Sequence, residues 1–258
     1  LFANQLLLGL AQAATVMLLM GLITWVARRQ SIHLEQEIGV AVVRGFLQVV
    51  VTGSALLVVF QSTRLVGLLV LLAMIVMAAL IAQRRTTDIP GSFGVALYSI
   101  GGGAGTILIA MTWLGLIDPA LSSLIPVGSM IIASAMKVCA LALERFKAEV
   151  AAHVGLIESS LALGARPATI VTPYAHDAIA ASLIPMIDSM RSLGIVWIPG
   201  LMTGMILTGT DPLYAALYQF VVLGMILATS ALTALLTGLL IRSHIFTPAE
   251  QLQAWLRE

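Results

Sequence analysis

Residues 65–82 read LVGLLVLLAMIVMAALIA, a run of 18 residues without a charged side chain. A helix needs about 20 consecutive apolar residues to cross the hydrocarbon of a bilayer. A membrane-spanning β-strand would instead alternate apolar with polar side chains over about 10 residues. The run shows no such alternation, so it predicts a membrane-spanning helix and an all-α fold.

Six further stretches satisfy the same requirement of length and composition. The whole chain agrees, because 60% of its 258 residues are apolar and only 10% are charged, against roughly 45–50% and 25% in ordinary soluble proteins. So few charges cannot cover the surface of a soluble globular protein of this length. We therefore expect a polytopic membrane protein in which residues 1–258 form a single transmembrane domain of about seven helices, at residues 6–27, 40–60, 65–82, 95–117, 124–143, 178–198 and 214–241.

The positively charged residues predict the orientation of the chain, since cytoplasmic loops carry an excess of Lys and Arg. With the N-terminus outside, nine of the 13 Lys and Arg residues fall in inner loops and only Arg64 falls in an outer loop. The remaining three fall within spans: Arg44, Lys137 and Arg191. We expect the N-terminus outside and the C-terminus in the cytoplasm, in a multi-pass protein of the cell's inner (plasma) membrane.

The sequence lacks the motifs of a nucleotide-binding or catalytic chain. Its two lysines, Lys137 and Lys147, do not follow a glycine-rich loop, so no P-loop can bind nucleotide phosphates. The patterns His-Glu-x-x-His, Cys-x-x-Cys and Gly-x-Ser-x-Gly are absent. A net charge of +1 gives no electrostatic field for nucleic acid. We expect a chain that is not an enzyme, binds no cofactor and no nucleic acid, and depends on another polypeptide if ATP drives it.

The longest cytoplasmic loop, residues 144–177, contains the run IESSLALGARP at residues 157–167. We expect a short helix from Glu158 to Leu163, ended by Gly164 in a left-handed conformation and stopped by Pro167. Such a helix either docks in a groove of another protein, with Leu161 as an anchor, or lies on the inner leaflet of the membrane.

This run resembles the Glu-Ala-Ala…Gly coupling motif of ABC-transporter permeases, with the acid and the glycine six residues apart. In those proteins the loop docks on the ATPase subunit. The resemblance therefore implies a separate ATPase partner, which binds ATP and Mg²⁺. It also implies a set of ATPase-coupling residues in this chain: Glu158, Ser159, Leu161, Ala162, Gly164 and Arg166.

Five other segments carry a second resemblance. They are RGFLQ at residues 44–48, IDSMRSLG at 187–194, IPGLMTGMIL at 198–207, Thr210-Asp211-Pro212 and Tyr218-Gln219. These segments are similar to the hallmark segments of the FetB-like permeases, a family of ABC-transporter permeases that includes a bacterial iron-export permease and plant aluminium-tolerance permeases. The resemblance implies a permease domain that forms a homodimer with two copies of the ATPase subunit. It favours metal ions, iron first, as the exported cargo.

The residues themselves leave other functions open. An ABC exporter of an organic, lipid or sugar-nucleotide substrate would need the same coupling helix. A stand-alone channel or ion-coupled carrier would work without an ATPase, and a membrane scaffold would transport nothing.

Charged side chains within the spans mark candidate functional positions, because a charge at the bilayer centre costs roughly 2.5–3.5 kcal/mol and faces the bundle interior or water. Arg44 and Gln48 are four residues apart and share a helical face. Asp188 and Arg191 are three residues apart and are spaced to form an ion pair. These four residues line the translocation path or a gate, or else Asp188 and Arg191 form a structural pair that holds two helices together. Lys137 is expected to extend its amine to the inner interface.

Glycines mark two further regions. Residues 199–212 are glycine-rich and too short to cross the membrane, which predicts a re-entrant turn or a short helix on the outer side. We place an outer gate or a dimer contact there, with Gly200 and Gly204 as its candidate residues. Gly101, Gly102, Gly103 and Gly105 allow close helix contact in the fourth span, and Gly101 and Gly105 have Gly-x-x-x-Gly spacing.

The residues that would bind a transported metal stay unknown. Asp188 is almost the only carboxylate within the spans, and Met186 and Met190 lie one helical turn apart beside it. These three are weak candidates, because methionine is also an ordinary apolar filler.

Overall fold

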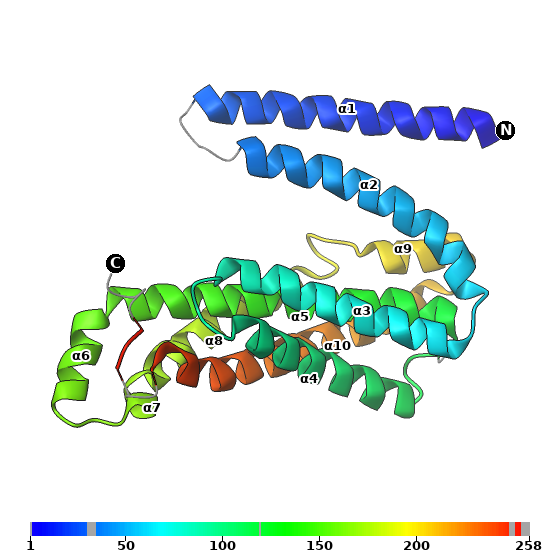
Figure 1. Ribbon diagram of the computed structural model, residues 1–258. Coiled ribbons are helices and arrows are strands. Elements are labelled where there is room, and N and C mark those ends of the chain that lie inside the picture. Colours follow the sequence, from blue (N-terminus) through cyan, green and yellow to red (C-terminus); the bar gives the residue numbers. More distant parts are fainter. Residues whose placement is uncertain (1, 30–34, 119, 248–250, 254–258) are drawn as a thin grey trace. The chain divides into compact units, whose positions relative to one another are not determined.

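The computed structural model describes the chain apart from residues 1, 30–34, 119, 248–250 and 254–258 (Figure 1). Within the described ranges every regular element is a helix, which confirms the predicted all-α class. Seven of these helices are long and apolar enough to cross a membrane. Each contains most of one predicted span: α1 (Phe2–Arg29), α2 (Glu35–Phe60), α3 (Arg64–Ala82), α4 (Ser92–Trp113), α5 (Leu121–Ala152), α8 (Thr172–Ser192) and α10 (Pro212–Ile241).

Short helices connect or follow the long ones. They are α6 (Val154–Ala162), α7 (Pro167–Ile170), α9 (Gly200–Leu207) and the 3₁₀ helices η1 (Gln83–Arg85) and η2 (Arg242–Ile245). The helix α9 is one of the two forms predicted for residues 199–212. The segment 144–177 is mostly helical, because α5 continues to residue 152 and α8 starts at residue 172. Hydropathy detects only the part of a helix that lies in lipid, so it missed these continuations.

The chain divides into two compact units, which are described separately. The first, residues 1–62, holds α1 and α2, which pack against each other. The second, residues 63–258, is built around α5 and α10. The helix α10 contacts α4, α5 and α8, and α5 also contacts α3, α4 and α8.

The core of the second unit forms where α4, α5 and α10 meet. Ile100, Ile131 and Met225 are among its buried side chains. Cys139, the only cysteine of the chain, is also buried, and its Sγ accepts a hydrogen bond from Thr237 Oγ1 at 3.4 Å. The helices of this core therefore contact one another through small and hydroxyl-bearing side chains as well as large apolar ones, as is usual in membranes.

The close approach of α4 to α10 depends on Gly103. A Cβ added at this position would overlap the side chain of Thr233 and lie 3.1 Å from the backbone nitrogen of Thr233. A Cβ at Gly105 would meet nothing within 4 Å, and one at Gly101 would lie 3.7 Å from Ile75. Of the four glycines expected to allow close helix contact, Gly103 therefore makes the tightest one. The Gly101/Gly105 spacing does not, because the rotation of α4 about its axis, which the spacing alone does not determine, turns Gly103 toward α10.

The helix α5 is held near both of its ends. At its start, the Leu121 side chain fills the space above Gly67 of α3. Towards its end, Glu144 pairs with Arg85 of η1 at 3.2 Å, and Lys147 pairs with Asp88. Exposed ion pairs of this kind contribute little free energy, so they orient this end of α5 more than they stabilise it.

We expect Gly103→Ala to lower the free energy of unfolding by about 1–3 kcal/mol, because the added methyl group overpacks the contact with Thr233. The matched variant Gly105→Ala adds the same methyl group where it meets nothing and should leave stability equal or slightly higher. Thermal unfolding of the purified protein in detergent measures both. Equal midpoints for the two variants would contradict the assignment of the close contact to Gly103.

Candidate functional site

The predicted short cytoplasmic helix is present as α6, which begins four residues earlier than expected and ends at Ala162. Its end is built as the sequence predicts. Gly164 has a φ of +83°, in the left-handed region, and its amide donates to the Leu161 carbonyl at 2.9 Å. Pro167 then occupies the first position of the one-turn helix α7. These features confirm the predicted termination at Gly164.

The candidate coupling residues lie mainly on the accessible side of this region. Ser159, Ala162, Gly164 and Arg166 are exposed, whereas Glu158 and Leu161 are half-buried. Within α6, whose nine residues are all described, Ile157 is the only one that is buried. Most of α6 is thus free to contact another protein, and one side chain anchors it to the membrane-spanning unit.

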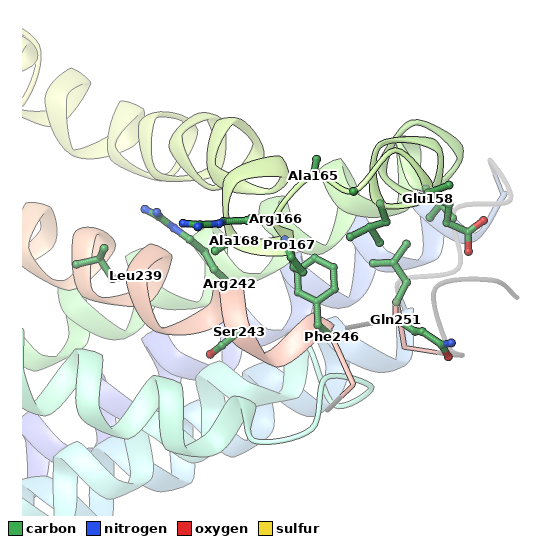
Figure 2. A pocket seen from close by; sticks show the side chains of 15 residues that line it. Glu158, Ala165, Arg166, Pro167, Ala168, Leu239, Arg242, Ser243, Phe246 and Gln251 are labelled. Atoms are coloured by element: carbon green, nitrogen blue, oxygen red, sulfur yellow. The ribbon is translucent and has the colours of Figure 1, made fainter. Parts of the chain in front are cut away.

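An open cavity of about 1600 Å³ lies between α6–α7 and the end of α10 (Figure 2). Five of the candidate coupling residues line it. The sequence-based reasoning missed the residues that form its opposite wall: Arg242, Ser243, Phe246, Gln251 and Leu252. Figure 2 shows Arg166 and Arg242 towards the end of the cavity that is nearer Leu239, with Glu158 and Gln251 towards the other end.

Arg242 joins two of the spans at this cavity. Its Nε donates to the Gly238 carbonyl at 2.9 Å, and its Nη1 donates to Thr172 Oγ1 at 3.3 Å. Thr172 is the first residue of α8, so the end of α10 is tied to the start of α8. In the sequence Arg242 contributes only to the positive charge of an inner loop, and no local signal indicates this contact.

Asp188 and Arg191 form the ion pair that their spacing allows. Arg191 Nη1 lies 3.5 Å from Asp188 Oδ1, and the two side chains are 78% and 61% exposed, respectively. They lie on the side of α8 opposite its buried residues, which include Ala178 and Ser182. Both partners of the pair belong to α8 itself, and its role in a path or in holding two helices together stays a prediction.

Arg44 and Gln48 share one face of α2, where both line a surface depression. They belong to the first unit, whereas Asp188, Arg191 and the exposed Lys137 belong to the second.

The three metal candidates, Asp188, Met186 and Met190, all lie on α8. Among the described residues no group of three or more His, Cys, Asp or Glu side chains is placed to hold a metal ion. Met186 and Met190 are partly buried and pack against the apolar core, which is the role of ordinary filler. Gly200 and Gly204 lie on the exposed helix α9, and a Cβ at either would meet nothing within 4 Å.

The structure shows the surroundings of two segments that carry the second resemblance, residues 210–212 and 218–219. Asp211 caps the start of α10, since its Oδ1 accepts hydrogen bonds from the amides of Leu213 and Tyr214 at 2.9 and 3.0 Å. Pro212 follows at the first helical position, which suits proline.

Gln219 is only 2% exposed, and its Oε1 has no hydrogen-bond partner in the described part of the chain. The sequence marked Gln219 only as part of a motif, and its burial within α10 makes it a further polar position of interest.

Comparisons with known proteins bear on the whole chain. The model of a family described as "Uncharacterised protein family (UPF0014)" matches residues 10–246. The probable iron export permease protein FetB of Escherichia coli is 30% identical over 228 residues, which are 88% of each chain. Protein ALUMINUM SENSITIVE 3 of Arabidopsis thaliana is 30% identical over 95% of this chain and 90% of its own. The UPF0014 membrane protein STAR2 of rice, Oryza sativa, is 29% identical over 97% of this chain and 88% of its own. No solved structure shows a significant match.

We expect Gly164→Ala to destabilise the end of α6 by about 1–2 kcal/mol, because an L-residue is strained at this positive φ. Gly155→Ala is the matched control, since it lies within the same helix and its Cβ also meets nothing within 4 Å. This control should strengthen α6 through higher helix propensity. Amide hydrogen exchange of residues 156–166 measures both effects. Unchanged protection in Gly164→Ala would contradict the left-handed end of α6.

Proposed function

This chain belongs to the UPF0014 family of membrane proteins, and we propose on that premise that it is the membrane-spanning permease subunit of an ATP-driven ABC exporter. It is a multi-pass membrane protein, as its seven apolar helices in the described ranges and the family both indicate. The observation that carries the proposal is α6: a short helix, largely accessible, that ends in a well-defined left-handed turn beside the spans.

The proposed partner is an ABC ATPase subunit that binds ATP and Mg²⁺ and docks on α6. The permease acts as a homodimer with two copies of this partner, in the inner (plasma) membrane. In this arrangement residues 1–258 act as one permease domain, and residues 144–177 form its coupling region. The contacts to the ATPase come from the coupling residues on and after α6, from Glu158 to Arg166.

The proposed orientation puts α6 in the cytoplasm and the N-terminus outside. Two observations support it. The residues around α6 share one cavity with Arg242 and Phe246, which follow α10, so both lie at the same end of the second unit. The Arg85–Glu144 and Lys147–Asp88 pairs join α5 to the segment after α3, both close to the cytoplasmic side in this orientation. The basic residues therefore gather at the end where α6 lies, as the positive-inside rule requires.

The proposed cargo is a metal ion, with iron first. Support comes from the relative named as a probable iron export permease. Arg44, Gln48, Asp188 and Arg191 line or brace the path, and Gly200 and Gly204 form an outer gate or a dimer contact. An exporter needs only weak and accessible cargo binding, which Asp188 can supply without a closed set of ligands.

The proposal is tested with proteoliposomes that hold the chain alone, the chain with its co-purified ATPase subunit, or the chain with an ATPase subunit whose P-loop lysine is replaced. We expect ATP-dependent Fe²⁺ movement only with the intact ATPase. Uphill movement by the chain alone would contradict the permease assignment in favour of an ion-coupled carrier. ATP-dependent movement of an organic or lipid substrate, with Fe²⁺ left in place, would contradict the cargo alone.

We expect Gly204→Leu to abolish transport while the unfolding midpoint and ATPase binding stay unchanged. A Cβ at Gly204 meets nothing within 4 Å in this chain, so a loss of transport with an unchanged unfolding midpoint would arise from the path or from the second copy of a homodimer. Gly105→Leu is the matched control, because a Cβ at Gly105 also meets nothing within 4 Å. Full transport by Gly204→Leu would exclude a gate or a dimer contact at this position.

A further inference from the structure

After α10 the chain folds back on itself. Phe246 and Leu252 form an antiparallel β-bridge. The Thr247 amide donates to the Gln251 carbonyl at 2.8 Å, and the Gln253 amide donates to the Ile245 carbonyl at 3.1 Å. We call this pair of short arms, residues 245–247 and 251–253, the clasp. Its backbone bonds hold both arms in a defined position beside η2.

The clasp and α6 share one apolar cluster. Ile245 is fully buried and Leu252 is only 3% exposed, and both belong to the same apolar cluster as Ile157. Ile157 is the buried anchor of α6, and Val154 and Leu161 of α6 pack against this cluster from its edge. The anchor of α6 and the clasp, which continues from α10, therefore belong to one connected group of apolar side chains, and Val154, Leu161 and Leu252 line the same cavity.

A second contact fixes the start of α6. His153 separates α5 from α6, with a φ of −119° and a ψ of 22° that break the helix. Its ring stacks on Tyr174 of α8, with centroids 4.9 Å apart and planes 25° apart. Its Nδ1 lies 2.8 Å from the Glu149 carbonyl oxygen, which holds the ring in place from the side of α5.

We propose that Leu252 and His153 are positioning residues that transmit movement of α6 to the spans, Leu252 to α10 through the clasp and His153 to α8 through Tyr174. A nine-residue helix anchored by a single buried side chain would tilt by itself when a partner pushes on it. Because the His153 ring contacts α8 and the apolar cluster around Ile157 includes the clasp, tilting of α6 then moves the ends of α8 and α10. The inference rests on the proposed function, since the docked ATPase is what pushes on α6.

The first test is Leu252→Ala in the complete complex with the ATPase subunit, in proteoliposomes. ATPase binding and ATP hydrolysis should stay within about twofold of the unmodified complex, whereas cargo moved per ATP should fall by about fivefold or more, a typical coupling factor. Leu252→Met keeps the apolar contact and should keep the ratio. Leu235→Ala, at an exposed leucine of α10, is the matched control and should also keep it.

The second test asks whether stacking of the His153 ring on Tyr174 is sufficient, or whether the imidazole itself is needed. His153→Phe keeps an aromatic ring for Tyr174 and should retain the cargo-to-ATP ratio, whereas His153→Ala should lower it by about fivefold or more. Equal losses in the two variants would overturn the role of the ring contact.

The outcomes distinguish this inference from the proposed function. If Leu252→Ala keeps the full cargo-to-ATP ratio, or loses ATPase binding and hydrolysis in parallel with a lower unfolding midpoint, the positioning role of Leu252 is wrong and the exporter assignment stands. If the unmodified chain moves cargo without the ATPase subunit, the exporter assignment itself is wrong. A lowered ratio with intact binding and an unchanged midpoint supports the inference.

Discussion

Backbone amides in hydrocarbon have no water to bond with, and the architecture of this chain follows from that requirement. Long helices satisfy their amides internally, and hydroxyl side chains bond back to their own helix, as Thr237 does to the Thr233 carbonyl. Where α10 begins, Asp211 supplies an acceptor for two amides that have no helical partner. Because lipid gives no hydrophobic drive for helices to associate, contact must come from close packing. Gly103 allows it by leaving room for Thr233.

The spans and the end of α6 could be predicted from sequence because both depend on local chemistry. Apolar length determines a span, and Gly164 followed by Pro167 determines where a helix stops. Other features depend on tertiary contacts that no local pattern encodes. The choice of Gly103 over Gly101 and Gly105 depends on how α4 is rotated against its neighbours. Leu252 lies among polar residues, a pattern typical of an exposed segment, yet it is buried against the core. Sequence reasoning therefore identified α6 and missed what holds it.

The helix α6 is largely accessible, and few side chains attach it to the rest of the second unit. In the proposed function α6 docks on the ATPase, and a helix with this role must expose most of its surface to the partner, which leaves few side chains for its own anchoring. Here the attachment is shared among Ile157, the clasp and the stacked rings of His153 and Tyr174. Arg242 adds a polar tie between the end of α10 and the start of α8 in the same place. The helix α6, the segment after it and the end of α10 thus surround one cavity, and Arg242 ties this end of α10 to the start of α8.

The length of α5 lets this one helix reach contacts at both ends of the second unit. Its 32 residues make a rod of about 48 Å, whereas the hydrocarbon is only about 30 Å thick. Its middle is embedded among α3, α4, α8 and α10, its far tip reaches the α6 corner, and its opposite tip presses Leu121 onto Gly67. The one helix therefore joins the α6 end of the second unit to the contact between Leu121 and Gly67 at the other end, and Pro126 near its start is the point at which it is expected to bend.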